Sequence, residues 1–339
     1  MSPSPKEFAG SPNPLDAQGA DVLADVLDSM RLSTVLYGRF ELRAPWGIQF
    51  CANPVAHMVL VARGTARLEV EGVKEAITLS AGDLALLPHG GGHTIRDAEG
   101  SPLHLLGKGE CQPVRGVGAI QLGGDGARTT LVAGSFRVGA TPRPLLFERL
   151  PRLVHIAADD PTVAPSLAST AQLLIAESAA ATPGATVIMS RLADILLVQA
   201  LRVHIASGQC GENGLCALAD PHISKALALI HEQPATPWTV ESLASGVALS
   251  RSGFAARFTE LVGMPPLEYL ARWRMTQAAQ LLRETELPLS ELAETIGYQS
   301  EASFNRAFKR WEGSTPGVYR REHRRGGGET RSAPLIAEA

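Results

Sequence analysis

Residues 240–270 read VESLASGVALSRSGFAARFTELVGMPPLEYL, and residues 289–319 read LSELAETIGYQSEASFNRAFKRWEGSTPGVY. The two stretches are copies of one pattern, because identical residues recur fifty positions apart: Ser250 and Ser300, Phe254 and Phe304, Phe258 and Phe308, Gly263 and Gly313, Pro266 and Pro316, Tyr269 and Tyr319. Upstream of the serines the offset is 49, as Leu243 and Leu292 show, so the second copy is one residue longer in its turn. Each copy predicts a short helix, a tight turn and a longer helix.

Local chemistry supports a helix–turn–helix in each copy. The short helices are predicted over residues 240–247 and 290–296, where apolar residues at i, i+4 spacing, such as Leu243 and Val247, face inward. The turns are predicted at residues 248–249 and 297–299. Ser250 and Ser300 then occupy N-cap positions, where a side-chain oxygen accepts a backbone N–H that the helix leaves unpaired. The phenylalanines of each longer helix are expected to be buried.

The side chains between those phenylalanines are predicted to point outward, and their chemistry suits DNA. Arginine binds guanine through two hydrogen bonds, asparagine does the same for adenine, and serine serves either base. A linking helix over residues 266–283 would hold the two longer helices one turn of DNA apart, about 34 Å. The candidate DNA-binding residues are Ser250, Arg251, Ser252 and Arg257 in the first copy, and Ser300, Glu301, Ser303, Asn305, Arg306, Lys309 and Arg310 in the second.

The charge distribution agrees with this interpretation. A single match of this kind is also compatible with a helical hairpin that has a solvated basic face, but two copies in register argue against it. The net charge of −3 argues weakly against a wholly basic nucleic-acid binder. Because charge acts locally, the basic residues in or beside the two copies matter more. They are Arg251, Arg257, Arg272, Arg274, Arg306, Lys309, Arg310, Arg320, Arg321, Arg324 and Arg325.

Residues 220–323 resemble the DNA-binding domain of the AraC/XylS-type transcription regulators along its whole length. The resemblance rests on residues 250–258, the helix LEYLARWRMTQAAQLL and the second copy, above all Gly297–Tyr298, Ser303–Phe304, Phe308–Lys309 and Pro316. It implies double-stranded promoter DNA and RNA polymerase as partners, and activation as the commoner behaviour. Members often carry a large polar or basic residue near Ala255 and Ala256, so the first copy is expected to read fewer bases directly.

The N-terminal part has a different texture. Residues 21–33 have helical spacing, whereas residues 34–147 alternate short apolar segments with Gly, Pro and Asp turns, which is typical of an all-β barrel or sandwich. The segment from Gly82 to Asp97 resembles the second sequence motif of cupin barrels, with His93 at the place of a metal ligand. The first cupin motif is degraded, because Cys51, Asn53 and His57 stand where such barrels normally supply two histidines and a glutamate.

We therefore expect a sensor rather than a catalyst in the barrel, with His57, His89 and His93 as candidate contacts of an unknown small effector. No cofactor is expected, although Cys51, His57 and His93 could hold zinc. The alternative is a cupin metalloenzyme with a DNA-binding appendage, but an iron oxygenase site would need a carboxylate that this set lacks. A redox effector acting on Cys51 and Cys111 is a further alternative, because exposed thiolates respond to oxidants.

The remaining segments complete a multidomain α+β chain. Helices over residues 166–180 and 184–206 either cover the barrel or pair with a second copy, and we expect a homodimer. The predicted order is a disordered arm at residues 1–20, a cupin-like sensor and dimerisation domain at 21–205, a linker at 206–219, an all-α domain with two helix–turn–helix units at 220–325, and a disordered tail at 326–339. No secretory signal or membrane span is found, and we expect a cytoplasmic protein whose four cysteines are thiols.

Overall fold

The computed structural model describes residues 21–30, 32–53, 55–106, 119–138, 145–160, 165–180, 182–207 and 214–325. The predicted arm and tail, Cys111 and Cys210 lie outside these residues, as do residues 208–213 of the predicted linker. The described residues divide into two compact units, one of residues 26–220 with 255–266, and the other of residues 21–25, 221–254 and 267–325.

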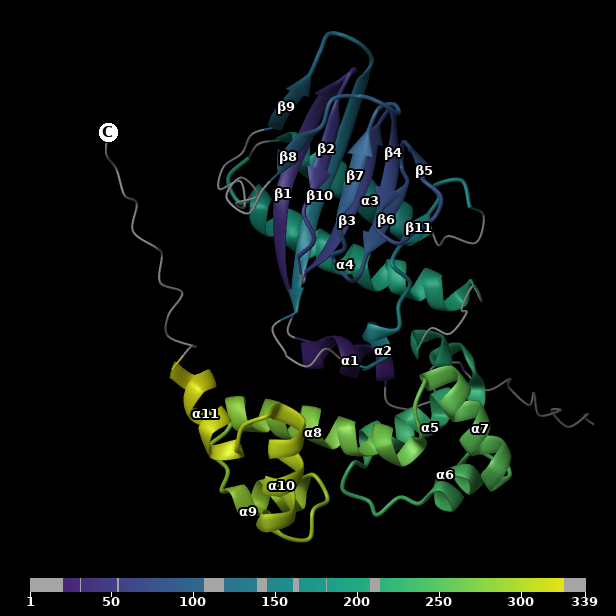
Figure 1. The fold of residues 1–339 in the computed structure, drawn as a ribbon, viewed down its shortest axis with the longest axis vertical. Helices are drawn as coiled ribbons and strands as arrows, with labels where there is room; N and C mark the ends of the chain where they lie inside the picture. The colour runs from purple at the N-terminus through teal and green to yellow at the C-terminus, as the bar shows by residue number, and fades with distance from the viewer. Residues whose placement is uncertain are drawn as a thin grey trace, which may run out of the picture. The chain divides into compact units, whose positions relative to one another are not determined.

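The N-terminal part is built on two sheets, which face one another in Figure 1. A six-stranded sheet has the order β11-β6-β3-β10-β1-β9, and a five-stranded sheet has the order β5-β4-β7-β2-β8. All pairs are antiparallel except β1 with β9 and β2 with β8. The strands are β1 (Leu32–Arg43), β2 (Gly47–Phe50), β3 (Ala56–Arg63), β4 (Thr65–Val70), β5 (Ile77–Ser80), β6 (Leu84–Leu87), β7 (His93–Arg96), β8 (His104–Leu106), β9 (Ala119–Gly123), β10 (Arg128–Val138) and β11 (Val154–Ile156).

The core lies between the two sheets and follows from strand periodicity. Along β4 buried residues alternate with more exposed ones, so Ala66, Leu68 and Val70 point inward. Strand β3 is buried over its first six residues, as expected for a strand covered on both faces. Trp46, which is fully buried, and Phe40 supply the largest side chains of this core. The predicted all-β character is therefore confirmed for the described residues between 34 and 138, whereas residues 145–147 of the predicted range lie in a short helix, Leu145–Glu148.

Residues of the cupin-like motif form tight turns between the strands of this barrel. Gly82 and Gly90 both have a positive φ, of 95° and 63°. A Cβ atom at Gly90 would lie 2.0 Å from the carbonyl oxygen of Val55, which excludes any larger residue there. Asp97, which stands where the motif usually has asparagine, accepts a hydrogen bond from the backbone N–H of Trp46 at 2.8 Å. The aspartate therefore ties the end of β7 to the start of β2.

The N-terminal part also contains helices. They are α1 (Val22–Met30), α2 (Leu145–Glu148), α3 (Pro165–Ala180), α4 (Ala185–Ala206) and the 3-10 helix η1 (Gly214–Ala219), which occupies the end of the predicted linker. Helices α3 and α4 pack against each other and against β1, so they cover the six-stranded sheet, which is one of the two alternatives stated for them (Figure 1). Each of the two nevertheless leaves large apolar side chains exposed: Leu173, Val187, Ile188 and Ile195.

The C-terminal part is all-helical, as predicted. Its helices are α5 (Pro221–Glu232), α6 (Val240–Gly246), α7 (Arg251–Val262), α8 (Pro266–Glu284), α9 (Leu289–Thr295), α10 (Glu301–Glu312) and α11 (Pro316–Arg325). Helix α8 is the predicted linking helix, and α6–α7 and α9–α10 are the two predicted pairs. Among the described residues, none of the helices has the length and apolar character needed to cross a membrane.

Candidate nucleic-acid interface

The two turns share one hydrogen-bond pattern. In the first, the N–H of Leu249 donates to the carbonyl of Ala244 at 3.0 Å; in the second, the N–H of Tyr298 donates to that of Ala293 at 2.8 Å. The preceding residues, Ala248 and Gly297, both have a positive φ, of 58° and 85°. The patterns match at an offset of 49, so the additional residue of the second copy is Gln299.

The serine caps form as predicted. The hydroxyl oxygen of Ser250 accepts the N–H of Gly253 at 3.2 Å, and that of Ser300 accepts the N–H of Ser303, also at 3.2 Å. The Ser303 hydroxyl in turn donates to the carbonyl of Ser300 at 2.7 Å. These three candidate DNA-binding residues therefore fix the starts of α7 and α10, and Ser250 and Ser300 remain exposed there.

Buried phenylalanines set the rotation of each longer helix. Phe254, Phe258, Phe304 and Phe308 are all fully buried. The ring centroids of Phe304 and Phe308 lie 5.6 Å apart in an edge-to-face arrangement, and Phe308 meets Tyr319 at 5.4 Å in the same way. Because residues four apart share one face of a helix, the opposite face of α7 and of α10 must point to solvent.

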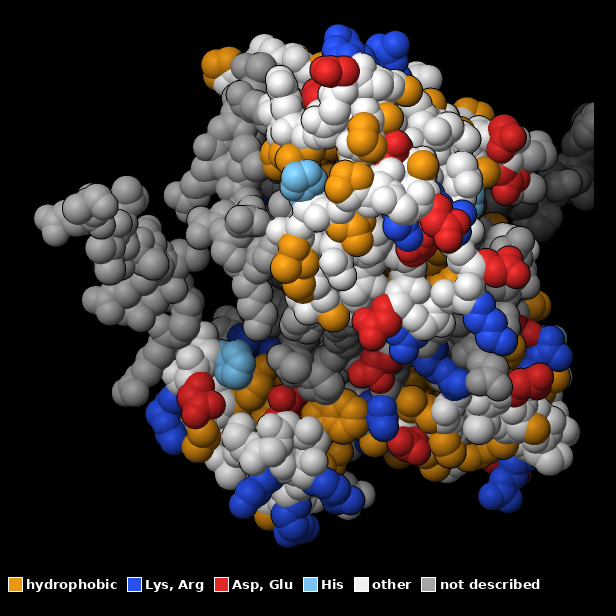
Figure 2. Space-filling view, turned by 45° about the horizontal axis from the view of Figure 1, so that its top comes forward, with side chains coloured by type: hydrophobic (Ala, Val, Ile, Leu, Met, Phe, Trp, Pro, Cys, Tyr) orange, Lys and Arg blue, Asp and Glu red, His pale blue; other side chains and the backbone are white. Residues whose placement is uncertain are grey.

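The exposed face of α10 is basic. Arg306, Lys309 and Arg310 are exposed, together with Glu301. Figure 2 shows a group of Lys and Arg side chains at the tip of the lobe that holds α9 and α10 in Figure 1. Asn305 is only half-buried; its Nδ2 approaches Glu301 at 3.5 Å, and its buried Oδ1 has no partner among the described residues. The second copy thus presents three cations where a helix would face DNA.

The exposed face of α7 is less basic, because one of its arginines is already paired. Arg251 and Ser252 are exposed, as expected. The Nε of Arg257, however, donates to the carboxylate of Asp220 at 2.6 Å, and the same pair forms an ion pair. Asp220 is buried and directly precedes α5. Desolvation makes a buried carboxylate costly without its partner, so we infer that Asp220 holds Arg257 in this ion pair.

Two further arginines of the predicted basic cluster lie on α8 and bind neighbouring residues of the protein. Arg274 donates to the carbonyls of Pro234 at 2.7 Å and Thr236 at 2.9 Å, and burial lowers the pKa of its guanidinium. Arg272 stacks over the ring of Trp311 at 4.9 Å and pairs with Glu268 at 3.2 Å. These contacts join the linking helix to its surroundings. The three cations of α10 are exposed, as are Arg251 and Arg321 of the same cluster.

The candidate effector contacts lie in the barrel, where His57 and His93 are neighbours. Their ring centroids are 5.1 Å apart, and the ring of Phe50 stacks on His93 at 4.5 Å. His57 shares a hydrogen bond of 3.0 Å with Asn53, and His93 one of 3.2 Å with the carbonyl of Gly91. The Nε2 of His93 is buried and has no partner among the described residues.

His89 and Cys51 stand apart from this pair. His89 is bound to the carbonyl of Leu150 at 2.6 Å, and Cys51 is a free, exposed thiol. No group of three or more His, Cys, Asp or Glu side chains within the described ranges is arranged to hold a metal ion. The suggested zinc ligands Cys51, His57 and His93 are therefore not assembled, and the residues present do not fit the ion.

Both buried histidines resist protonation. Burial, with a contribution from the neighbouring His93, lowers the pKa of His57 to about 3. Burial also lowers the pKa of His93 to about 4, against the effect of its hydrogen bond to Gly91. Both imidazoles are therefore neutral at physiological pH.

These two pKa values predict that the barrel loses stability in mild acid. Below the ordinary value of 6.5 the unfolded chain binds protons that the folded barrel excludes, so stability is full above that pH and falls as pH drops toward about 4. Replacement His93→Phe should flatten the decline, measured as the urea midpoint across pH. Replacement of the exposed His104 by Gln is the control; an identical decline in wild type and His93→Phe would contradict the prediction.

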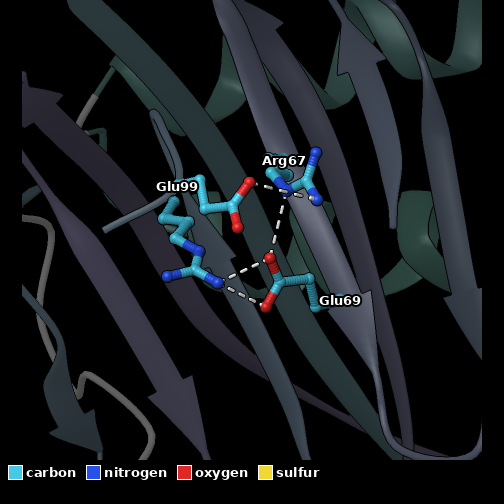
Figure 3. Close-up of polar contacts among 4 residues, drawn as sticks. Arg67, Glu69 and Glu99 are labelled. Carbon is cyan, nitrogen blue, oxygen red and sulfur yellow. Dashed lines mark hydrogen bonds and ion pairs between the residues drawn. The ribbon is translucent and has the colours of Figure 1, made fainter. Parts of the chain in front are cut away.

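A polar cluster lies on the outer face of the five-stranded sheet (Figure 3). Arg67 and Arg96 lie opposite each other on β4 and β7, and both contact Glu69, at 3.1 Å and 2.6 Å. The hydrogen bond from Arg96 is the largest cause that lowers the pKa of Glu69. Glu99 lies 3.9 Å from Arg67. Two cations meet two carboxylates here, so the cluster is internally neutralised and suits cross-strand stabilisation.

The exposed basic face of α10 indicates a DNA-binding protein, and comparisons with known proteins agree. A cupin family model matches residues 21–206, and a helix-turn-helix domain model matches residues 243–322. The chain is 39% identical over 306 residues to a Streptomyces lividans protein described as an AraC-like transcription regulator, with 89% of this chain and 98% of the relative covered. It is 31% identical over 317 residues to the HTH-type transcriptional regulator AlkR of Acinetobacter baylyi, with 89% and 99% covered.

Among solved structures, the chain is similar to the DNA-binding domain of AdpA in complex with a target DNA. That match has 33% identity and a TM-score of 0.30, and it covers 32% of this chain and 96% of that chain. The protein belongs to the AraC-type transcription regulators and carries an N-terminal cupin domain. It is thus a DNA-binding regulator and not an enzyme.

Proposed function

We propose that this regulator binds promoter DNA in the cytoplasm with both helix–turn–helix units, responds to an effector in the cupin domain and activates transcription through RNA polymerase. One observation carries the proposal: the exposed cations of α10 stand on a helix whose opposite face is locked by two fully buried phenylalanines. A helix held in this way presents its polar side chains to the major groove without rearrangement.

The effector is proposed to contact His57 and His93. The pair is buried, neutral and lined by Phe50, and the Nε2 of His93 is an unused polar atom among the described residues. This chemistry suits a small, largely apolar molecule with one polar group. An effector can act only through unequal affinity for the DNA-competent and incompetent states, so it must change the affinity of the full chain for DNA.

We further propose a homodimer formed through α3 and α4. Leu173, Val187, Ile188 and Ile195 expose 47–64% of their surface, which is a large apolar area for helices that already cover a sheet. A second copy of the same face would bury these side chains in a self-complementary contact. Sedimentation equilibrium should give twice the 35.8 kDa of the chain, and a mass of one chain at micromolar concentration would reject the dimer.

The function is tested by enrichment of duplexes from a random DNA library on the full chain, followed by titration of the enriched duplex at several salt concentrations. Binding should weaken as salt rises, because cations that contact phosphates release counterions. A reporter driven by the enriched sequence should then rise when the protein is expressed. Recovery of no preferred duplex, either alone or with candidate effectors present, would reject the proposal.

A further inference from the structure

The internal repeat allows each exposed position of α10 to be compared with its equivalent in α7. Both helices start at a serine cap, bury phenylalanines at the same two positions, and are followed by Gly263 and Gly313 with positive φ of 85° and 76°. The helices therefore have the same length and rotation. Residues fifty apart therefore occupy equivalent positions on the two exposed faces that are proposed to contact DNA, here called the reading faces of α7 and α10.

The comparison shows that α7 lacks every cation that α10 presents. Arg306 corresponds to Ala256, Lys309 to Thr259 and Arg310 to Glu260, and all six side chains are exposed. At the start of the helices Arg251 corresponds to Glu301, also both exposed. The exposed charges of α10 sum to a clear positive value, whereas Arg251 and Glu260 cancel on α7.

Arg257, the other arginine of α7, does not add a positive charge to the reading face of that helix. Arg257 corresponds to Ala307, which is half-buried, so this position lies at the side of the reading face. The structure agrees, because Arg257 is paired with the buried Asp220. The reading face of α7 between its buried phenylalanines therefore consists of the methyl groups of Ala255 and Ala256.

We propose that the two modules divide recognition unequally, with Ala256 as the residue that sets the difference. The α10 module reads bases directly, whereas the α7 module fits the groove closely and tolerates most base pairs. The target DNA then has one sequence-constrained segment and, about one helical turn away, a degenerate segment. A methyl group can favour a thymine methyl but cannot form the bidentate hydrogen bonds that distinguish guanine or adenine. The inference rests on the proposed DNA-binding function.

The experiment compares DNA enriched from a random duplex library by the full-length wild type and by Ala256→Arg. The wild type should yield one constrained segment. Ala256→Arg should add a second one, with a guanine preference on the order of tenfold, since Arg and guanine form the commonest specific pair. For Ala256→Arg, the slope of log affinity for DNA against log salt concentration should steepen by at most about one unit relative to the wild type. Ser245→Arg, which adds the same charge to the exposed surface of α6, is the matched control and should add no constrained segment.

The outcomes separate this inference from the function on which it rests. Two equally constrained segments in the wild-type selection would overturn the unequal division while leaving DNA binding intact. An Ala256→Arg selection identical to that of the wild type would overturn the role of Ala256. Failure to enrich any duplex would reject the proposed function itself.

Discussion

Replacement of Phe304 by alanine is expected to lower the free energy of unfolding of the C-terminal helices by about 3–5 kcal/mol. The ring is fully buried, packs edge to face on Phe308 and lies 6.0 Å from the ring of Tyr298. It belongs to a core that also holds Leu282, Leu292 and Ile296. Truncation would leave a cavity among close-packed neighbours in addition to removing apolar contact. Urea unfolding followed by the helical circular dichroism signal measures the loss.

A matched replacement distinguishes cavity formation from a general effect of mutation. Phe304→Leu keeps most of the apolar volume and should cost less than about 1.5 kcal/mol, provided that the core repacks. Equal losses for the two variants would contradict the packing argument. A loss below about 1 kcal/mol for Phe304→Ala would show that the ring does not anchor α10.

Replacement of Arg306 by alanine is expected to weaken binding to the enriched duplex by about 1–3 kcal/mol, on the order of 5- to 150-fold. Arg306 is exposed on the face of α10 opposite its buried phenylalanines, so its removal should take away the proposed base contact and leave the fold intact. Unfolding in urea should therefore be unchanged. Fluorescence anisotropy titration of the duplex gives the affinity.

The control is Arg306→Lys, which keeps the charge and loses the planar fork that grips guanine. It should retain affinity for unrelated DNA and lose discrimination at one base pair, because lysine cannot reproduce the bidentate geometry. If Arg306 contacts only a phosphate, Arg306→Ala would weaken all sequences alike and reduce the salt slope by about 1. Unchanged affinity would remove Arg306 from the interface.

The helical part of the molecule was predictable because its signals are local. The serine caps, the phenylalanine spacing and the one-residue difference between the turns depend on residues within a few positions of one another, and all are found in the structure. The pairing of Arg257 was not foreseen, since its partner Asp220 lies 37 residues away in the sequence. Comparison of the two copies could have indicated that Arg257 lies away from the DNA-facing surface, because its equivalent in the second copy is the small, apolar Ala307.

The barrel was predictable in kind but not in detail. Alternating apolar segments indicated strands, but the order of strands in the two sheets depends on pairings between distant segments, such as β1 with β10. The histidine spacing pointed to His57 and His93, which do meet. It gave no sign that His89 would bind the carbonyl of Leu150 or that Cys51 would face solvent, because both depend on which neighbours the fold supplies.

The placement of Gln299 has a consequence for the history and engineering of the chain. The extra residue precedes the Ser300 cap, and everything from that cap to Gly313 matches residues 250–263 without insertion or deletion. A crossover between the two gene segments downstream of the caps would thus preserve the helical phase. Natural recombination or a deliberate graft at such a junction could exchange the two DNA-facing helices. A junction between the short helix and the serine cap would instead add or remove one residue in the turn.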